Sequence, residues 1–273
     1  MLKVENLSVS LNNTLILQNI SYHFENNKVY GLLGPNGAGK STFFKAILNV
    51  INYSGSISLP SYHIGHLIEA PAFYANLSCF QNLKLHSKYL NIACDIDEYL
   101  SIVQLQEAKY KKYKNLSMGM KQRLGIAKTL IGNSNLILLD EPTNGLDPSG
   151  IKDIRNIILD RVKSNHRTSI ISSHILQEVV TFTDVFIFIK NGKLVTHLKN
   201  TGKYYSILEF NQKMNIENNY KSREYSIVKF NSSYYVVGDY EWLKNYDSSI
   251  TKMTIEDIYL WLMEHEIEEA YLK

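Results

Sequence analysis

The chain has 273 residues, of which 45% are hydrophobic and 20% charged, the balance of a globular protein that buries a sizeable core. This composition excludes a disordered tail, a fibrous repeat and a miniprotein held together by disulfides. The net charge of +3 is too small to indicate an electrostatic footprint for nucleic acid, so we expect no nucleic-acid partner.

The sequence contains no segment that predicts a membrane span or a secretory signal. Its longest apolar run, Ile258 to Met263, has six residues, whereas a spanning helix needs about twenty. The N-terminus carries Glu5 early and lacks an apolar signal core. Cys79 and Cys94 show neither metal-ligand spacing nor the density of a disulfide scaffold, which fits a reducing compartment. We therefore expect a cytoplasmic protein.

The first fifty residues predict strands followed by a helix. Residues 2–9 and 15–24 alternate apolar and polar side chains, which is typical of half-buried strands, and Asn12-Asn13 predicts the turn between them. A short apolar strand over residues 29–33 runs into a glycine-rich loop, and the spacing after this loop predicts a helix over 42–50.

A mainly α-helical segment is predicted from about residue 73 to 130, where apolar residues recur at helical spacing. The α/β pattern then resumes with strands at 136–139, 169–172 and 185–189, a helix at 149–163, and an Asn191-Gly192 hairpin turn leading to 193–195. From about residue 204 the pattern predicts strands at 225–230 and 234–237 and a closing helix at 255–268.

The glycine-rich loop matches the phosphate-loop pattern G-x-x-x-x-G-K-[ST] in the strand-to-helix setting that this motif requires, and it reads Gly34-Pro35-Asn36-Gly37-Ala38-Gly39-Lys40-Ser41-Thr42. Its glycines let backbone N–H groups wrap the phosphates of a nucleotide at the start of the helix. Lys40 reaches the β- and γ-phosphates and the Ser41 hydroxyl ligates Mg²⁺. The pattern therefore predicts a bound nucleoside triphosphate with Mg²⁺.

Two carboxylates follow the predicted strand at 136–139. Asp140 stands at its C-terminal tip, where open α/β sheets bind ligands, and is placed to hold Mg²⁺ through water. Glu141 comes next and is the candidate general base toward the attacking water. An Asp-Glu pair alone is more often a turn, but together with the phosphate loop it indicates a functional site.

With Leu116-Ser117-Met118-Gly119-Met120 placed ahead of Lys121-Gln122-Arg123, these motifs resemble the ABC ATPase family over roughly residues 1–200. The resemblance implies that Ser117 and Gly119 belong to the signature motif, whose helix faces the γ-phosphate of ATP held by the other subunit of a head-to-tail dimer. Met118 and Met120 depart from the usual Leu-Ser-Gly-Gly-Gln. The resemblance also implies that Asp147 lies in the loop crossing the dimer interface and that His174 is the switch histidine contacting the γ-phosphate.

At two further positions the sequence differs from the residues that are usual in the family. Glu69 stands where the family commonly has a glutamine, and its carboxylate is a further candidate ligand for Mg²⁺ or for the attacking water. This substitution resembles the bacitracin-resistance and lantibiotic-immunity branch, whose transporters remove antimicrobial peptides. Leu11 stands where an aromatic side chain usually stacks on adenine, so a stacking contribution of roughly 1 kcal/mol is lost.

The expected fold is α/β: a RecA-like phosphate-loop ATPase core with an N-terminal antiparallel β region, an inserted helical subdomain and a small C-terminal α+β accessory region. The resemblance implies an ATPase domain over residues 1–203, with its core in 1–68 and 134–203 and the helical subdomain at about 69–133. Residues 204–273 form the accessory region, for which we expect core packing and dimer contact.

The leading hypothesis is the ATP-hydrolysing subunit of a transporter. It pairs with itself or a homologous ATPase subunit, lies peripherally on the inner face of the cell membrane, and drives separately encoded permease subunits received near residues 69–83. The main alternative is a non-transport ABC ATPase acting on nucleic acid or ribosomes, but those usually carry a coiled-coil insertion or two ATPase units. A third hypothesis is a phosphate-loop kinase. It does not explain why residues 116–123, Asp147 and His174 match the motifs of the ABC ATPase family.

Overall fold

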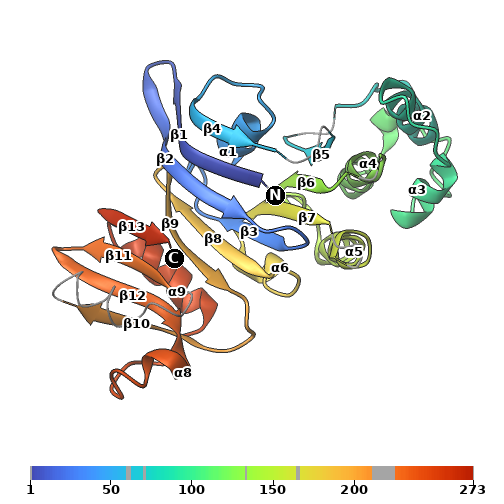
Figure 1. The fold of residues 1–273 in the computed structure, drawn as a ribbon. Coiled ribbons are helices and arrows are strands. Elements are labelled where there is room, and N and C mark those ends of the chain that lie inside the picture. Colours follow the sequence, from blue (N-terminus) through green and yellow to red (C-terminus); the bar gives the residue numbers. More distant parts are fainter. Residues whose placement is uncertain are drawn as a thin grey trace.

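A six-stranded sheet forms the centre of the molecule (Figure 1). The computed structural model describes residues 2–59, 63–69, 72–132, 134–163, 167–210 and 225–272. In the order β5-β6-β7-β3-β8-β9, the first five strands run parallel and β9 is antiparallel to β8. The strands are β3 (Val29–Leu33), β5 (Ile64–Leu67), β6 (Leu136–Asp140), β7 (Thr168–Ser173), β8 (Val185–Lys190) and β9 (Lys193–Lys199).

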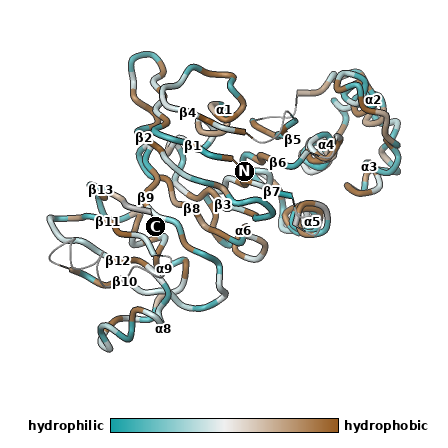
Figure 2. The backbone as a smooth tube through the Cα atoms, in the orientation of Figure 1, coloured by the Kyte–Doolittle hydropathy of each residue, from teal (hydrophilic) through white to brown (hydrophobic). Residues whose placement is uncertain are grey.

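Strands β3, β6 and β7 are buried along their whole length, and in β6 the continuous apolar run predicts this burial on both faces. Figure 2 shows the hydrophobic stretches of β6 and β8 in the middle of the molecule. Along β6, Leu136 and Leu138 belong to the hydrophobic cluster under the N-terminal sheet, whereas Ile137 and Leu139 belong to the cluster under the helices of the opposite face. The alternation of side chains thus places one apolar layer on each face of the sheet.

A second sheet, in the order β2-β1-β4, covers one of these faces together with helix α1 (Lys40–Ile47). Its antiparallel strands are β1 (Leu2–Leu11), β2 (Thr14–Phe24) and β4 (Ser54–Ser58). The predicted turn is confirmed, because Asn12 and Asn13 have positive φ angles of 49° and 62°. The helix predicted at 42–50 is displaced: it begins at Lys40, directly after the phosphate loop, and ends at Ile47, since Asn49 adopts a left-handed conformation with φ 56°.

The predicted helical segment is confirmed as α2 (Cys79–Tyr89), α3 (Ile96–Ile102), a short 3₁₀ turn (Tyr113–Asn115) and α4 (Met118–Leu130). In Figure 1 these helices lie at one end of the central sheet, beyond β5. Ser78 and Gln81 form a reciprocal capping box at the start of α2. The helix predicted at 149–163 is α5 (Pro148–Ile158) followed by a π-helical turn (Leu159–Lys163), and the short α6 (Leu176–Val179) follows β7.

The C-terminal part of the chain forms a four-stranded antiparallel sheet in the order β10-β12-β11-β13. Its elements are β10 (Tyr205–Phe210), β11 (Ser226–Phe230), β12 (Ser233–Asp239), α8 (Tyr240–Leu243), α9 (Ile255–Glu264) and β13 (Glu269–Leu272). It has a small hydrophobic cluster of its own, but Ile258 and Leu262 of α9 are buried in the same cluster as Phe186 and Phe188 of β8. Helix α9 therefore joins this sheet to the core.

The predicted closing helix at 255–268 is wrong in its last four residues. The chain leaves helical geometry at His265, with φ −96° and ψ 138°, and Glu268 donates its backbone N–H to the Lys229 carbonyl at 2.8 Å. Residues 269–272 then pair with β11 as the edge strand β13. Tertiary pairing with a strand some forty residues earlier ends the helix, which local spacing does not reveal. Within the described ranges, every helix is too short or too polar to span a bilayer.

Candidate nucleotide-binding site

The phosphate loop connects β3 to α1, as its motif predicts. Gly39 precedes the helix with φ 104°, a conformation that side-chain-bearing residues avoid, and an added Cβ there would lie 2.6 Å from the Leu17 side chain. At Gly34 an added Cβ would lie 2.2 Å from the Ile189 carbonyl oxygen of β8. The loop is thus packed tightly against β2 and β8, and the first backbone N–H groups of α1 form the anion-binding end of a helix.

Lys40 is only 5% exposed, and its ammonium lies at the mouth of the loop. Nζ donates to the carbonyl oxygens of Gly34 at 2.7 Å and Pro35 at 3.2 Å, and it lies 3.2 Å from Oε1 of Glu141. Because phosphate oxygens are stronger acceptors than carbonyls, a bound triphosphate can compete for these donors. Lys40 is therefore held in the loop by contacts that a bound triphosphate can replace.

The Glu141 carboxylate bridges two of the predicted site residues. While Oε1 faces Lys40, Oε2 lies 2.9 Å from Nδ1 of His174, which follows β7. Glu141 itself has a left-handed backbone, with φ 44°. Such a conformation is sparsely populated by residues other than glycine and persists where surrounding contacts impose it. The fold thus brings Lys40, Glu141 and His174 together from three separate segments of the sequence.

Ser172 is a site residue that the sequence reasoning missed. Its hydroxyl donates to Oδ1 of Asp140 at 2.6 Å and accepts the backbone N–H of Glu141 at 2.9 Å. Ser172 is fully buried and pairs with Asp140 across β6 and β7, so one hydroxyl orients both carboxylate residues. The sequence gives little signal for it, because β7 reads Thr-Ser-Ile-Ile-Ser-Ser and Ser172 is one of three serines in this strand.

A further set of hydrogen bonds connects the segments that follow β6 and β7. Thr143 donates its hydroxyl to Oε2 of Glu178 on α6, and the Ser173 hydroxyl lies 3.5 Å from the same oxygen. Glu178 therefore ties the loop after β6 to the helix after His174. Neither Thr143 nor Glu178 is predicted by the motifs, because their contact joins the loop after β6 to α6, which meet only in the folded chain.

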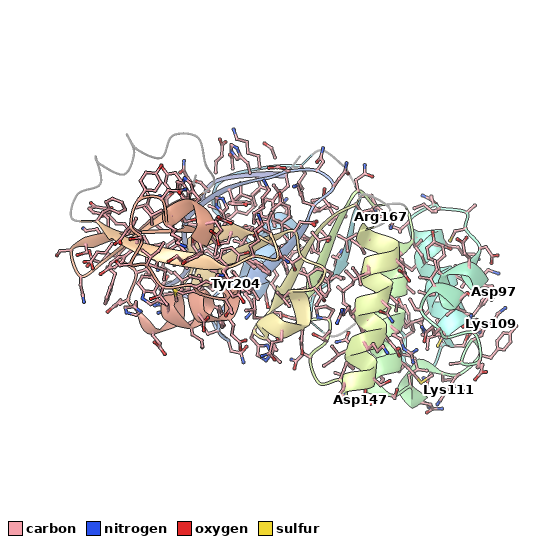
Figure 3. All side chains as sticks on the ribbon, turned by 90° about the horizontal axis from the view of Figure 1, so that it is seen from below. Asp97, Lys109, Lys111, Asp147, Arg167 and Tyr204 are labelled. Atoms are coloured by element: carbon pink, nitrogen blue, oxygen red, sulfur yellow. The ribbon has the colours of Figure 1, made fainter. Side chains whose placement is uncertain are left out.

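The predicted signature and interface residues lie at helix starts on the helical side of the molecule. Ser117 caps α4 by accepting the N–H of Met120 at 3.3 Å, and Asp147 caps α5 by accepting the N–H of Gly150 at 3.0 Å. Gly119 faces the Leu146 side chain, with 3.7 Å from an added Cβ to Leu146 Cδ2. Figure 3 shows Asp147 at the N-terminal start of α5. These caps leave Ser117 and Asp147 bonded within their own helix starts.

Glu69 and Leu11 occupy more exposed positions. Glu69 Oε1 lies 2.6 Å from Nζ of Lys45, and 65% of its side chain is exposed; Ala70 and Pro71, which follow it, lie outside the described residues. Lys45 is five residues along α1 from Lys40, a rise of about 7.5 Å. Glu69 therefore pairs with the far side of α1 in this structure. Leu11 ends β1 opposite Thr14 and is 41% exposed, so it offers an aliphatic surface to solvent.

Sequence comparisons match this chain to transporter ATPases. A model of the ABC transporter family matches residues 17–144. The lantibiotic transport ATP-binding protein SrtF of Streptococcus pyogenes is 42% identical over 212 residues, covering 74% of this chain and 92% of that protein. The bacitracin transport ATP-binding protein BcrA of Bacillus licheniformis is 40% identical over 213 residues, covering 71% of this chain and 69% of that protein.

Solved structures agree with this assignment. The structure of cbiO1 from Clostridium perfringens, described as part of the ABC transporter complex cbiONQ, is 27% identical with a TM-score of 0.63 over 74% of this chain and 89% of that one. An ATP-binding subunit of an ABC transporter is 25% identical with a TM-score of 0.65, covering 73% and 90%. The expected RecA-like phosphate-loop ATPase fold is confirmed. The chain therefore belongs to the ABC transporter family, as an ATP-binding subunit that hydrolyses ATP to drive transport.

Proposed function

We propose that this chain powers the export of antimicrobial peptides through separately encoded membrane subunits, and so confers immunity or resistance. The observation that carries the proposal is the similarity to SrtF and BcrA, whose names assign them to lantibiotic and bacitracin transport, at 40% identity or more. Glu69 supports it, because the same departure from glutamine marks the branch that the sequence resembles.

In this proposal Gly34 to Thr42 bind the triphosphate of ATP, and Lys40 exchanges its carbonyl contacts for phosphate oxygens. That exchange also weakens the contact between Lys40 and Glu141, which leaves Glu141 to orient the attacking water and accept its proton. His174, beside the same carboxylate, holds the base in place and contacts the γ-phosphate. Each of these steps uses side chains that already lie within hydrogen-bond distance of one another.

The donor set fits Mg²⁺, which prefers oxygen ligands and commonly uses one or two carboxylates or hydroxyls together with the phosphates. Asp140 is 9% exposed and fixed by Ser172, and Ser41 lies in the first turn of α1. We assign Ser41 as a direct ligand and Asp140 as a ligand through water, with Glu69 as a further candidate. When bound, the ion supplies charge neutralisation to the phosphates.

We propose a head-to-tail dimer, with itself or a homologous subunit, in which Ser117, Gly119 and Asp147 face the nucleotide held by the partner. Ser117 and Gly119 form the start of α4, which is a suitable anion site for a second subunit's γ-phosphate. The variant Glu141→Gln is expected to trap an ATP-bound dimer, which light scattering detects. A monomer at saturating ATP contradicts this arrangement.

We propose that the membrane subunits dock on a cleft whose lining residues lie outside the segment 69–83 that the sequence suggested. This cleft of about 510 Å³ opens between the end of α1, β5 and the end of α2. Its walls combine apolar side chains, including Leu48, Tyr89 and Leu90, with Lys128. A short permease helix with apolar and acidic side chains fits such a surface, and it would hold this chain peripherally at the cytoplasmic face of the membrane.

The proposal is tested by co-expressing the chain with the membrane-protein genes that neighbour its own. We expect co-purification, and an ATPase rate in the complex that rises when lantibiotic or bacitracin-like peptides are added. A scrambled peptide of the same composition serves as the control. Failure to co-purify, or a rate that no candidate peptide changes, would count against peptide export while leaving the ATPase assignment intact.

A further inference from the structure

The hairpin turn between β8 and β9 touches the phosphate loop. Asn191 and Gly192 both have positive φ angles, 48° and 74°, which is the geometry of a tight hairpin turn. The Gly192 N–H donates to the carbonyl oxygen of Ala38 at 3.1 Å, and its own carbonyl accepts the N–H of Gln18 at 2.8 Å. The turn is therefore wedged between the phosphate loop and β2. An added Cβ at Gly192 would lie 2.0 Å from the Ile16 carbonyl oxygen, so the fit is close.

The residue before this turn is clamped to the C-terminal region. Nζ of Lys190 donates to the carbonyl oxygens of Leu262 at 3.2 Å, Met263 at 2.6 Å and His265 at 2.9 Å. These carbonyls lie at the C-terminal end of α9, where helix carbonyls lack intrahelical partners and the helix dipole favours a cation. An ammonium has three donors, and Lys190 directs all of them at this helix end.

The N-terminal end of α9 contacts α6, the short helix that follows His174. The Gln177 side-chain amide donates to Oε1 of Glu256 at 3.1 Å, and Gln177 follows His174 by three residues. Between these two ends, Tyr259 packs on Phe188 of β8 with ring centroids 6.0 Å apart. Helix α9 thus runs beneath β8 from the His174 segment to the hairpin that supports the phosphate loop.

We infer that the C-terminal region holds the phosphate loop in its nucleotide-binding conformation through α9, with Lys190 as the positioning residue. Ala38 lies between two glycines with positive φ; its N–H donates to the Pro35 carbonyl within the loop at 3.2 Å, whereas its own carbonyl is held from outside by the Gly192 N–H. A loop that is ordered before binding does not spend binding free energy on ordering itself. This inference rests on the proposed role of Gly34 to Thr42 as the ATP site, and it gives residues 255–272 a function in nucleotide affinity.

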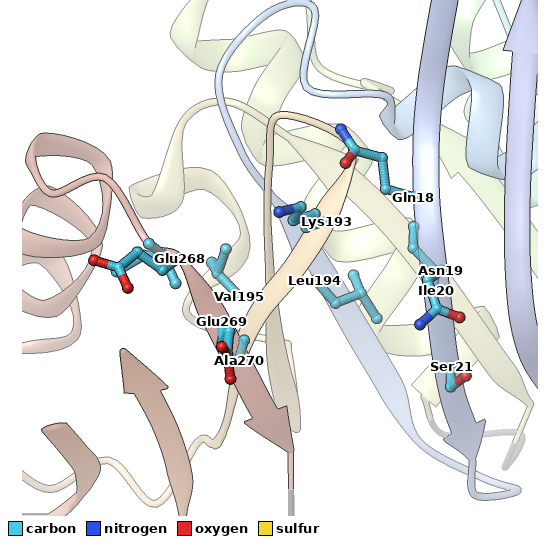
Figure 4. A pocket seen from close by; sticks show the side chains of 11 residues that line it. Gln18, Asn19, Ile20, Ser21, Lys193, Leu194, Val195, Glu268, Glu269 and Ala270 are labelled. Atoms are coloured by element: carbon cyan, nitrogen blue, oxygen red, sulfur yellow. The ribbon is translucent and has the colours of Figure 1, made fainter. Parts of the chain in front are cut away.

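The test compares Lys190→Met with two variants of the full-length chain. Lys190→Arg keeps a cation that can donate to the same carbonyls. Lys193→Met removes one positive charge from the same hairpin but on the other strand, where Lys193 borders the groove between β2, β9 and β13 (Figure 4). Three quantities are measured: the Kd of a non-hydrolysable ATP analogue, kcat at saturating ATP, and hydrogen exchange at the Gly192 amide.

We expect Lys190→Met to raise the Kd of the analogue between about threefold and tenfold. The variant loses charge-assisted hydrogen bonds, and only part of that lost free energy affects the phosphate loop. Its kcat should stay at the wild-type value, Gly192 should exchange faster, and Lys190→Arg should restore both Kd and exchange. Lys193→Met should behave as wild type. If Lys190 had a purely structural role, Lys190→Met would lower thermal stability but would not raise the Kd at an unchanged kcat.

A folded Lys190→Met with wild-type Kd and wild-type Gly192 exchange overturns the inference. If Lys190→Met does not fold, Lys190→Gln, which keeps part of the stem and two donors, takes its place with the same expected direction. Failure of the wild-type chain to bind the analogue at all would instead refute the proposed ATP site. The exchange rate of Gly192 needs no nucleotide, so the two failures are distinguishable.

Discussion

Ser172→Ala is expected to damage both stability and catalysis, because one buried hydroxyl orients Asp140 and Glu141. The substitution removes the hydrogen bond to Oδ1 of Asp140, and a hydrogen bond to a charged group contributes about 1.5–3 kcal/mol. It also leaves the Glu141 N–H without its acceptor, which costs about 1–3 kcal/mol where water cannot enter. Since Ser172 is 0% exposed, we expect the free energy of unfolding to fall by about 2.5–6 kcal/mol, the sum of the two contributions.

The expected effect on catalysis follows from the positions of the Asp140 and Glu141 carboxylates. Loss of the hydroxyl frees both carboxylate residues to shift, and a displacement near 1 Å costs about a hundredfold in rate, so kcat should fall by about 10- to 100-fold. The matched control is Ser169→Ala on the same strand. Ser169 is also 0% exposed, but its hydroxyl has no hydrogen-bond partner among the described residues. Its removal should change the free energy of unfolding by no more than about 1 kcal/mol and leave kcat unchanged.

Urea unfolding and steady-state ATPase rates measure both variants. If Ser172→Ala matches Ser169→Ala in stability and in kcat, the hydroxyl does not orient the carboxylates and the reasoning is refuted. A loss of stability without loss of kcat would confine Ser172 to a structural role.

Glu69→Ala should lower the rate of hydrolysis or transport at least several-fold if the Glu69 carboxylate reaches the metal or the attacking water. The free energy of unfolding should change by less than about 1 kcal/mol, because the ion pair of Glu69 with Lys45 is exposed. Lys45→Ala separates the roles: an equal loss of turnover in both variants assigns the effect to the ion pair, and full turnover in Glu69→Ala reduces Glu69 to a loop acid. Burial lowers the pKa of His86 from 6.5 to about 4, so the unfolded chain binds a proton that the folded chain does not, and stability should fall as pH drops from 6.5 to 4. After allowance for solvent screening the loss is on the order of 1–2 kcal/mol, which urea unfolding of the wild type and of His86→Asn can resolve; equal pH slopes in the two would contradict it.

Several parts of this molecule are predictable from the sequence because their causes are local. The phosphate loop needs glycine at positions where the backbone is left-handed or closely packed, and a pattern search finds those positions. The strand at 136–139 is apolar throughout because both of its faces are covered. The Asn12-Asn13 and Asn191-Gly192 turns follow from residues that tolerate positive φ.

Other parts depend on contacts between distant segments. Nothing near residue 264 in the sequence ends α9; the end is set by Lys190 from another hairpin and by pairing of β13 with β11. Ser172 reads as one more strand residue until β6 and β7 are placed side by side. The pairing of Glu69 with Lys45 likewise depends on where the loop after β5 meets α1.

We propose that Lys40, Glu141 and His174 together form the hydrolytic site of this ABC ATPase. The most direct test is the ATP hydrolysis rate of Glu141→Gln, measured beside its affinity for ATP. Loss of a general base should lower kcat by about 10²- to 10⁴-fold while the affinity for ATP is kept. A hydrolysis rate within about twofold of the wild type, at retained affinity, would contradict the assignment of Glu141 as the catalytic base.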